Sequence, residues 1–567
     1  MLLENFTKTI NIVGKKIFFK ISILTFFIMI LEIMGVAIVV PFIKIILGEP
    51  DQFVKKYNFL KLETFNQNEN FILFAIFILI VFFLFKSLFS IFVNRSFVYT
   101  VYRTRTNIQK KILDNFIGQN LEIHLNKNSS NMINIISNEV NVFCTATFLP
   151  LINFITELFV TIGLVSLMVL YEPTVFLFFS MSLILPVYFF YSFTKNKQKV
   201  FGMIREKYDE LALKRLQQAM HGIREVKLTD KEEIFAKLYH DDVSHSANSI
   251  AGSLAWTAYT KIFLEFLLVA SISLLTFFVF SKDSSTSTSL ISTLGLFAVA
   301  VFRILPSLSR IINSLQSITF GNNSLNTVHK SLEELKLVNP TKYLDINFKD
   351  KVSLKNLSFR YNNDNNIFDN INLEIYKGEL VGLIGPSGSG KSTLVDIISG
   401  LLKPIDGKII IDNKILGKYE KIKCGYVSQN VFLLDDTIQK NIAFGENEGE
   451  IDTNRINQAV RESQLEEFVK KLPNGLNTIV GERGTKISGG QKQRIGIARA
   501  LYSDASLLIF DESSNALDSK TEKEFFNTIL EMKKRKTIIF ISHKNIFIEH
   551  FDKIYKIKNN SIELSKD

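Results

Sequence analysis

The chain has 567 residues and a formal net charge of +11, and this length exceeds what one hydrophobic core supports, so several structural units are expected. A basic chain can indicate a nucleic-acid partner, but no DNA-binding or RNA-binding motif accompanies the charge, and we exclude that class. The two cysteines, Cys144 and Cys424, exclude a disulfide framework and a cysteine-rich zinc site.

Apolar stretches long enough to cross a hydrocarbon core of about 30 Å crowd the first half of the chain. Six of them lie at residues 21–43, 71–93, 148–170, 174–193, 257–280 and 289–305. The first is too long for the core of a signal peptide and lacks a small-residue cleavage pattern, so it predicts a span that stays in the protein. We therefore expect a helical membrane domain with six spans.

Positive charge is concentrated on one side of these spans. Lys15 and Lys16 precede the first span, and runs of Lys and Arg follow the second and the fourth. Because cytoplasmic loops are rich in Lys and Arg, the amino terminus and these two loops are expected in the cytoplasm. This topology accounts for the net charge.

The two expected cytoplasmic loops are about 50 to 60 residues long, and their periodicity predicts extensions of the membrane helices. Near their middles, residues 120–126 and 222–228 are either docking segments for a cytoplasmic partner or ordinary turns between helices. The mostly polar stretch 316–342 predicts a connecting helix and a linker. We expect the following boundaries: a transmembrane domain at 1–335, a linker at 336–350 and a nucleotide-binding domain at 351–567.

A glycine-rich turn in the second half lies between an expected strand at 380–384 and an expected helix at 393–402. Backbone N–H groups of such a turn bind phosphate together with a lysine, and the serine hydroxyl can ligate magnesium. The strand–turn–helix context of the pattern GxxxxGK[ST] predicts nucleotide binding. The residues of this turn are Gly385, Pro386, Ser387, Gly388, Ser389, Gly390, Lys391 and Ser392.

Two other segments have the chemistry to complete a nucleotide site. The apolar stretch 507–510 reads as a buried strand and ends in Asp511 and Glu512. Asp511 could hold the magnesium shell through water, and Glu512 could polarise a water for attack on a γ-phosphate. Tyr361, after a strand-like stretch at 351–360, could stack on an adenine ring. The alternatives are an acidic turn and an ordinary strand-end aromatic, which the phosphate-binding turn makes less favourable.

These motifs resemble, in their order, the ATPase of an ABC transporter. The residues that carry the resemblance are Tyr361, the glycine-rich turn, Gln429 in YVSQ, ISGGQ at 487–491, LLIFDE at 507–512, SSNALD ending at Asp518 and His543 in ISHK. Six spans before one ATPase domain are similar to a half-transporter of the type IV exporter class, so the resemblance covers the whole chain. It implies a polytopic α-helical membrane domain followed by an α/β P-loop ATPase domain.

The resemblance also implies roles in binding ATP and Mg²⁺ and in hydrolysis. The catalytic residues would be Glu512, His543 and Gln429, and the metal residues would be Ser392, Gln429 and Asp511. Since the family binds nucleotide between two head-to-tail ATPase domains, one chain with one such domain implies a dimer, and the presence of both Glu512 and His543 favours a homodimer over a heterodimer with one degenerate site. ATP would be contacted by Tyr361, the turn from Gly385 through Ser392, Thr393, Gln429, Asp518 and the signature residues Ser488, Gly489, Gly490 and Gln491, which reach the ATP of the other subunit.

Three basic residues inside the apolar spans are candidates for binding a transported substrate. Ionisable groups in a membrane are costly and usually face a cavity or a partner. Lys86, Lys261 and Arg303 fall roughly 20 to 30 Å below the outer ends of their helices, which suggests a shared anion site. The alternative is internal pairing, because Lys261 and Glu265 have i,i+4 spacing and Glu32 and Glu157 could neutralise the others.

The stretch VFRILPSLSRIINS at 301–314 and these basic residues resemble bacterial flippases for lipid-linked oligosaccharides of the N-glycosylation type. The resemblance implies ATP-driven flipping of a polyprenyl-diphosphate glycan across the bacterial inner membrane, with the ATPase domain in the cytoplasm. Two alternatives remain open. One is export of another amphipathic substrate, such as a drug, a peptide or lipid A. The other is a membrane-anchored ATPase that couples nucleotide state to a partner.

Overall fold

The computed structural model divides the chain into two compact units. The helical unit comprises Met1–Ile117 and Lys127–Val338, and the α/β unit comprises Gly118–Asn126 and Asn339–Asp567. The structure describes residues 2–46, 69–171, 173–282, 287–336, 342–344, 348–361, 366–417, 420–512, 519–533, 535–542 and 548–565.

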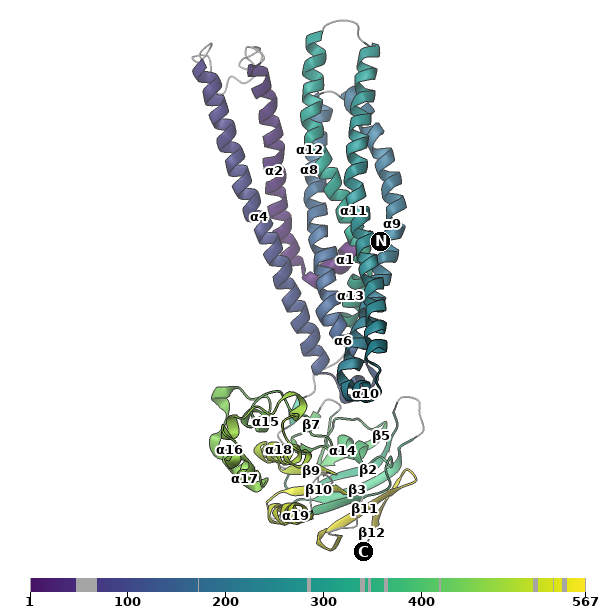
Figure 1. Cartoon of the computed structure of the whole chain (residues 1–567), viewed down its shortest axis with the longest axis vertical. Helices are drawn as coiled ribbons and strands as arrows, with labels where there is room; N and C mark the ends of the chain where they lie inside the picture. Colours follow the sequence, from purple (N-terminus) through teal and green to yellow (C-terminus); the bar gives the residue numbers. More distant parts are fainter. Residues whose placement is uncertain are drawn as a thin grey trace. The chain divides into compact units, whose positions relative to one another are not determined.

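Long helices run side by side through the helical unit (Figure 1). They are α2 (Lys15–Ile46), α4 (Glu69–Ile117), α8 (Leu149–Tyr171), α9 (Pro173–His221), α11 (Glu232–Lys282) and α12 (Ser287–Phe320). Helix α11 packs along α9, α12 packs along α8, and α2 contacts both α8 and α4. A short helix, α1 (Leu2–Val13), is followed by Gly14, whose φ of 100° makes the turn into α2.

Four segments of the described helices are long and apolar enough to cross a membrane. They are Lys15–Gly35, Ile76–Ile117, Ser129–Ser166 and Glu232–Leu274. The other two expected spans lie on α9 and α12, where some side chains of residues 174–193 and most side chains of residues 289–305 are outside the described part of the chain. Helices α4, α9 and α11 have 49, 49 and 51 residues, far more than the roughly 20 that a bilayer needs, as the periodicity of the loops predicted.

The extended ends of these helices are joined by shorter elements. Between α4 and α8 lie α5 (Leu121–Asn126), α6 (Ser129–Asn134), α7 (Val140–Val142) and two π-helical turns, Ile135–Glu139 and Phe143–Phe148. Helix α10 (Ile223–Leu228) joins α9 to α11, and α13 (Asn322–Lys336) follows α12. Helix α5 belongs to the α/β unit, where Leu121 packs against the core, which favours docking over a simple turn for residues 120–126.

A buried ion pair holds the helical unit together. Arg205 of α9 donates to both carboxylate oxygens of Glu139, at 2.7 and 3.1 Å, and also to Ser324 Oγ on α13 at 2.5 Å. The side chains of Arg205 and Glu139 are only 2% and 1% exposed. Near this pair the backbones of α9 and α12 approach closely at Gly202. A Cβ added at Gly202 would lie only 2.2 Å from Phe320 O. This pair therefore joins three separate segments of the unit.

Two sheets form the α/β unit. The six-stranded sheet has the order β12-β11-β4-β10-β9-β8, in which every neighbouring pair is parallel except β11 with β12. Its strands are β4 (Leu380–Ile384), β8 (Cys424–Val427), β9 (Leu507–Asp511), β10 (Thr537–Ser542), β11 (Lys553–Lys558) and β12 (Ser561–Ser565). The buried strands are almost continuously apolar, as a covered parallel sheet requires.

The other sheet is antiparallel, with the order β3-β2-β5-β6. Its strands are β2 (Lys351–Phe359), β3 (Phe368–Tyr376), β5 (Asp406–Ile411) and β6 (Lys414–Ile415), and a separate parallel pair joins β1 (Lys342–Leu344) to β7 (Glu420–Ile422). The helices of the unit are α14 (Lys391–Ile398), α15 (Ile438–Ile442), α16 (Thr453–Glu462), α17 (Glu466–Lys471), α18 (Gly489–Tyr502) and α19 (Ser519–Lys533).

Strand register brings the expected site residues to one edge of the six-stranded sheet. In β10, Ile541 pairs with Leu383 of β4 on one side and with Asp511 of β9 on the other. The segments that follow β4 and end β9 therefore emerge at the same carboxyl edge, separated by one strand. Ligands of open parallel sheets bind at such an edge.

Candidate functional site

The glycine-rich turn connects β4 to α14 as the sequence predicted, although α14 begins at Lys391 rather than at residue 393. Helix α14 ends at Ile398, two residues before Gly400, whose φ is 78°. Within the turn, Gly388 and Gly390 have φ values of 79° and 97°, a backbone conformation that favours glycine. No side chain caps the first turn of α14. This geometry suits binding of an anion by backbone N–H groups.

Lys391 folds back over this turn. Its Nζ donates to Gly385 O at 3.0 Å and to Pro386 O at 2.9 Å. Burial lowers the pKa of Lys391, while the carboxylates of Glu512 and Asp511 act in the opposite direction. The ammonium group thus lies among the carbonyl groups of the turn and in the electric field of two acidic side chains. In this position it could bind a phosphate held by the turn.

Asp511 is buried at the end of β9. Its Oδ2 accepts hydrogen bonds from Ser392 Oγ at 2.8 Å and from Tyr426 OH at 2.9 Å. A hydroxyl beside a carboxylate provides the hard oxygen donors that Mg²⁺ prefers, so the residues present fit this metal. Burial raises the pKa of the Tyr426 phenol, and the charge of Asp511 adds to the effect. The phenol therefore stays a hydrogen-bond donor.

Glu512 lies next to Asp511 in a constrained backbone conformation. Its φ is 49°, which is uncommon for a residue with a side chain and costs free energy, and its N–H bonds Ile541 O at 3.2 Å. The Glu512 Oε2 atom accepts a hydrogen bond from Gln429 Nε2 at 2.8 Å. The structure thus brings together the two residues that the sequence paired only through a resemblance.

The signature segment forms the start of α18. Ser488 caps the helix by accepting from Gln491 N at 3.3 Å, and Gln491 Oε1 accepts from Ser488 N at 2.9 Å. This reciprocal arrangement is a capping box, which explains a serine and a glutamine at this spacing. Each of the two side chains accepts from the backbone N–H of the other residue, and a Cβ added at Gly489 would meet nothing within 4 Å.

The remaining expected nucleotide residues divide into two groups. Tyr361 lies close to the start of α14, since its hydroxyl is 3.2 Å from Thr393 Oγ1, and its ring meets Phe359 edge-on. Asp518 and His543 lie outside the described residues. Tyr426 is the residue that sequence reasoning missed, although its place in YVSQ, three residues before Gln429, was a signal that could have found it.

The intramembrane basic residues are partly paired. Lys86 Nζ lies 2.7 Å from Glu32 Oε2, and these side chains are 15% and 11% exposed. Lys261 lies 3.9 Å from Glu265, with exposures of 74% and 55%. The side chain of Arg303 is outside the described part of the chain. Two of the three carboxylates that the sequence offered as partners, Glu32 and Glu265, thus lie beside these lysines, and the shared anion site stays a prediction.

Glu157, the other carboxylate weighed as a neutralising partner, pairs with a different cation. Its Oε1 lies 2.7 Å from Arg310 Nε of α12. Arg310 follows Arg303 by seven positions in the stretch that resembled the oligosaccharide flippases. The ion pair joins α12 to α8.

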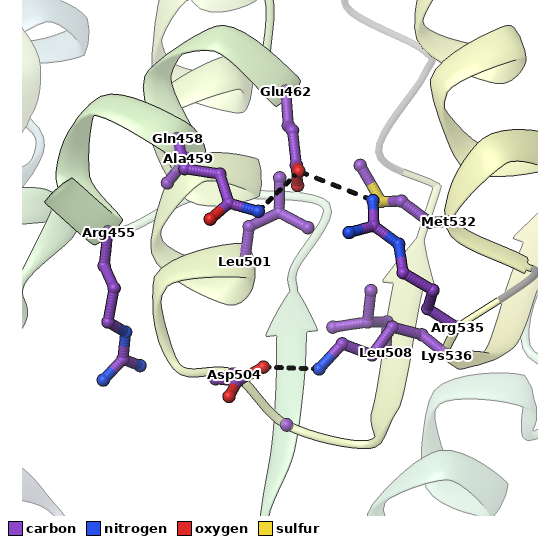
Figure 2. A pocket seen from close by; sticks show the side chains of 11 residues that line it. Arg455, Gln458, Ala459, Glu462, Leu501, Asp504, Leu508, Met532, Arg535 and Lys536 are labelled. Carbon is purple, nitrogen blue, oxygen red and sulfur yellow. Dashed lines mark hydrogen bonds and ion pairs between the residues drawn. The ribbon is translucent and has the colours of Figure 1, made fainter.

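A separate cavity of about 330 Å³ lies among α16, α18, α19 and the start of β9 (Figure 2). Two ion pairs cross it, Asp504–Lys536 at 2.6 Å and Glu462–Arg535 at 3.7 Å. Asp504 precedes β9, whereas Asp511 ends that strand, so the cavity is at the opposite edge of the sheet from the glycine-rich turn. None of the residues 385–393 lines it.

The two units together define a membrane protein with a P-loop nucleotide-binding unit. The family pattern described as "ABC transporter transmembrane region" matches residues 21–305, and the pattern described as "ABC transporter" matches residues 368–515. The chain belongs to the ABC transporter family. The expected fold class, a helical membrane domain followed by an α/β ATPase domain, is confirmed.

Relatives of this chain include named flippases and uncharacterised transporters. An "ATP-dependent lipid A-core flippase" of Cupriavidus pinatubonensis is 37% identical over 38% of this chain and 37% of its own. The uncharacterised YwjA of Bacillus subtilis is 40% identical over 38% of both chains. An uncharacterised protein of Sinorhizobium fredii, y4gM, is 29% identical over 80% of this chain and 78% of its own. The chain spans little more than a third of the length of the first two.

A solved structure described as a bacterial Atm1-family ABC exporter with ATP bound is similar to the whole chain. The TM-score is 0.76, with coverage of 97% of this chain and 96% of that one. The sequence identity is 20%. At this identity the likeness establishes the fold.

Proposed function

We propose that this chain is a subunit of an ATP-driven exporter that moves an amphipathic lipid across a membrane. One observation carries the proposal: Lys391, Ser392, Asp511, Glu512 and Gln429 lie at the carboxyl edge of one sheet, where Ser392 donates a hydrogen bond to Asp511 and Gln429 donates one to Glu512. This is the set of groups that phosphoryl transfer to water requires. It stands in a chain whose other half has the apolar helices of a membrane domain.

Each residue has a defined task in this proposal. Lys391 and the N–H groups of residues 387–392 hold the phosphates, with Thr393 and Tyr361 at the nucleoside side. Ser392, Asp511 and Gln429 hold Mg²⁺, which would neutralise charge on the β- and γ-phosphates. Glu512 accepts a proton from the attacking water. His543 and Asp518 complete the γ-phosphate contacts, as the resemblance implies.

The functional unit that we propose is a homodimer in the bacterial inner membrane, with the amino terminus and the ATPase unit in the cytoplasm. Ser488, Gly489, Gly490 and Gln491 would contact the ATP of the partner subunit. Two facts support this arrangement: Ser488 and Gln491 form a capping box, in which each side chain accepts from the other residue's backbone N–H, and so fix the signature residues at the start of α18, and Lys and Arg are concentrated in the expected cytoplasmic loops.

The substrate that we propose is a lipid-linked oligosaccharide with a polyprenyl diphosphate, contacted by Lys86, Lys261 and Arg303. Lys86 would exchange Glu32 for the diphosphate, and Lys261 has an exposed side chain with only a 3.9 Å contact to Glu265. Lipid A-core is the second candidate, because several relatives have names that specify it. Both lipids have phosphate beside an apolar anchor, so the same basic residues could bind either one.

A flipping assay in proteoliposomes tests the proposal. We expect ATP to move a fluorescent polyprenyl-diphosphate glycan to the other leaflet, while the Glu512→Gln variant binds ATP and hydrolyses it at least about 100-fold more slowly. Turnover by Glu512→Gln at the parent rate would show that the catalytic assignment is wrong.

The choice of lipid decides between the remaining alternatives. Movement of lipid A without movement of the glycan would favour the second candidate. Intact ATPase activity with no movement of either lipid would favour a membrane-anchored ATPase that acts on a partner. Unchanged glycan flipping after joint neutralisation of Lys86, Lys261 and Arg303 would rule out the anion site.

A further inference from the structure

We propose that Tyr426 is a positioning residue for the magnesium site, because its hydroxyl fixes the rotation of the Asp511 carboxylate. The inference rests on the proposed function, which places Asp511 at the metal. Tyr426 lies in β8, outside the glycine-rich turn and outside the catalytic pair Gln429 and Glu512. It does not touch the nucleotide in this proposal and acts only through Asp511.

Strand geometry explains why a tyrosine at this position reaches Asp511. Tyr426 pairs in register with Ile509 of the parallel strand β9, and Asp511 follows Ile509 by two residues. Alternate residues of a strand share one face, so Tyr426, Ile509 and Asp511 point to the same side of the sheet. Two residues advance a strand by about 6.6 Å, a gap that a phenol can cross and a shorter side chain cannot.

The side of the sheet that Tyr426 faces is the side covered by α14. Ile509 belongs to the same core cluster as Ile397 and Ile398 of that helix. Ser392, in the first turn of α14, reaches the same carboxylate from the other direction. The helix and the edge strand therefore hold Asp511 between two hydroxyl groups.

Both hydroxyl groups donate to the same oxygen of Asp511. Ser392 Oγ and Tyr426 OH lie 2.8 and 2.9 Å from Oδ2, which occupies the two lone pairs of that atom and leaves Oδ1 for the metal shell. Ser392 is itself a proposed metal ligand, so its orientation depends on the metal. Tyr426 is not, and its hydroxyl holds the carboxylate in place independently.

A hydroxyl group in the same sheet offers a matched comparison. Tyr555 of β11 donates from its OH to Glu374 O at 2.8 Å and accepts from Glu374 N at 3.2 Å, which are bonds between two strands that do not involve the glycine-rich turn. Tyr426→Phe and Tyr555→Phe remove the same atom, which bonds a carboxylate in the first case and the backbone of Glu374 in the second. A loss of general stability would affect both variants, whereas a loss of metal positioning would affect only the first.

The experiment uses the full-length protein in nanodiscs with the Glu512→Gln substitution, which keeps ATP bound. Free ATP is removed, and Mn²⁺ is titrated into the nucleotide-loaded protein and followed by electron paramagnetic resonance. Residues that orient metal ligands typically change metal affinity by about 10- to 100-fold. We expect Tyr426→Phe to weaken Mn²⁺ binding by at least about tenfold, with metal-free ATP affinity unchanged. Tyr555→Phe should leave both affinities unchanged.

Three results would overturn the inference. Equal Mn²⁺ affinity in Tyr426→Phe and in the Glu512→Gln parent would remove any role at the metal. An equal loss of ATP affinity with and without metal would place the role in the nucleotide pocket or in folding. Failure of the Glu512→Gln parent to bind Mn²⁺ with ATP would overturn the magnesium site itself, which identifies the proposed function as the part that failed.

Discussion

Gln429 donates a hydrogen bond to Glu512, from Nε2 to Oε2 at 2.8 Å, and its own carbonyl accepts one from Gln493 Nε2 of α18 at 2.5 Å. The carboxylate proposed to polarise water is therefore linked through one residue to the helix that starts with the signature segment. A displacement of α18 relative to the sheet would change the position of Gln429 and, with it, the contact to Glu512.

Substitution of Gln429 should slow hydrolysis. A hydrogen bond to a charged group contributes about 1.5–3 kcal/mol, so we expect Gln429→Ala to lower kcat for MgATP by about tenfold or more. Steady-state phosphate release measures the effect. Gln458→Ala removes a similar bond, to Glu462 at 2.9 Å on α16, and should leave kcat unchanged. An unaltered kcat in Gln429→Ala would contradict a role for this bond in hydrolysis.

Breaking the buried ion pair of the helical unit should destabilise it strongly. Arg205→Met leaves Glu139 charged and unpaired in the interior, which typically costs about 3–5 kcal/mol. We expect the temperature of the thermal unfolding transition to fall substantially. The fluorescence of Trp256, the sole tryptophan, monitors the transition.

Two further variants interpret this result. The double variant Arg205→Met/Glu139→Leu should recover most of the lost stability, because no charge then remains buried. Lys227→Met breaks an exposed pair with Glu232 and should have no measurable effect. If the double variant were as unstable as Arg205→Met, lost packing of the Arg205 side chain, and not the unpaired charge of Glu139, would explain the loss of stability.

Because Lys86 pairs with Glu32, substitutions of these two residues should change the apparent affinity for the glycolipid in opposite directions. If a diphosphate displaces Glu32 from Lys86, Glu32→Gln removes the competitor and should lower the glycolipid concentration that half-maximally stimulates ATPase activity. Lys86→Met should raise that concentration. Glu265→Gln should have a smaller effect, since Glu265 lies 3.9 Å from Lys261. Shifts in the same direction for the two Lys86–Glu32 variants would indicate a purely structural pair.

Lys403 should make the stability of the α/β unit depend on alkaline pH. Burial lowers the pKa of Lys403 from its ordinary value of 10.5 to about 8, with Glu420 opposing the shift and Lys421 adding to it. Between these pH values the unfolded chain binds more protons than the folded one, so stability rises as pH increases from about 8 towards 10.5. Below pH 8 the full cost of the buried charge is present.

Calorimetry of the full-length protein tests this dependence. Lys403→Met should raise the transition temperature of the α/β unit at pH 7, and the difference from the parent should narrow as pH approaches 10. A difference that stays constant across this range would show that the added apolar contact, instead of the removed charge, causes the stabilisation.

Much of the nucleotide site could be predicted because its chemistry is local. The glycine-rich turn and the strand that ends at Asp511 each depend on residues a few positions apart. Element ends were less predictable: α14 starts earlier and ends earlier than its apolar pattern indicated, since the turn runs directly into the helix and Gly400 follows its end.

By itself, the sequence determined the two-part architecture, the phosphate-binding turn and the acidic strand end. Long apolar stretches and short motifs can be recognised without knowing which distant residues they contact. Only the tertiary structure decided which distant side chains meet. The pairs Tyr426–Asp511, Lys86–Glu32 and Arg205–Glu139 join residues 85, 54 and 66 positions apart. These contacts depend on the order of the strands in the sheet and on which helix faces pack together. No short segment of the chain determines either of these two features.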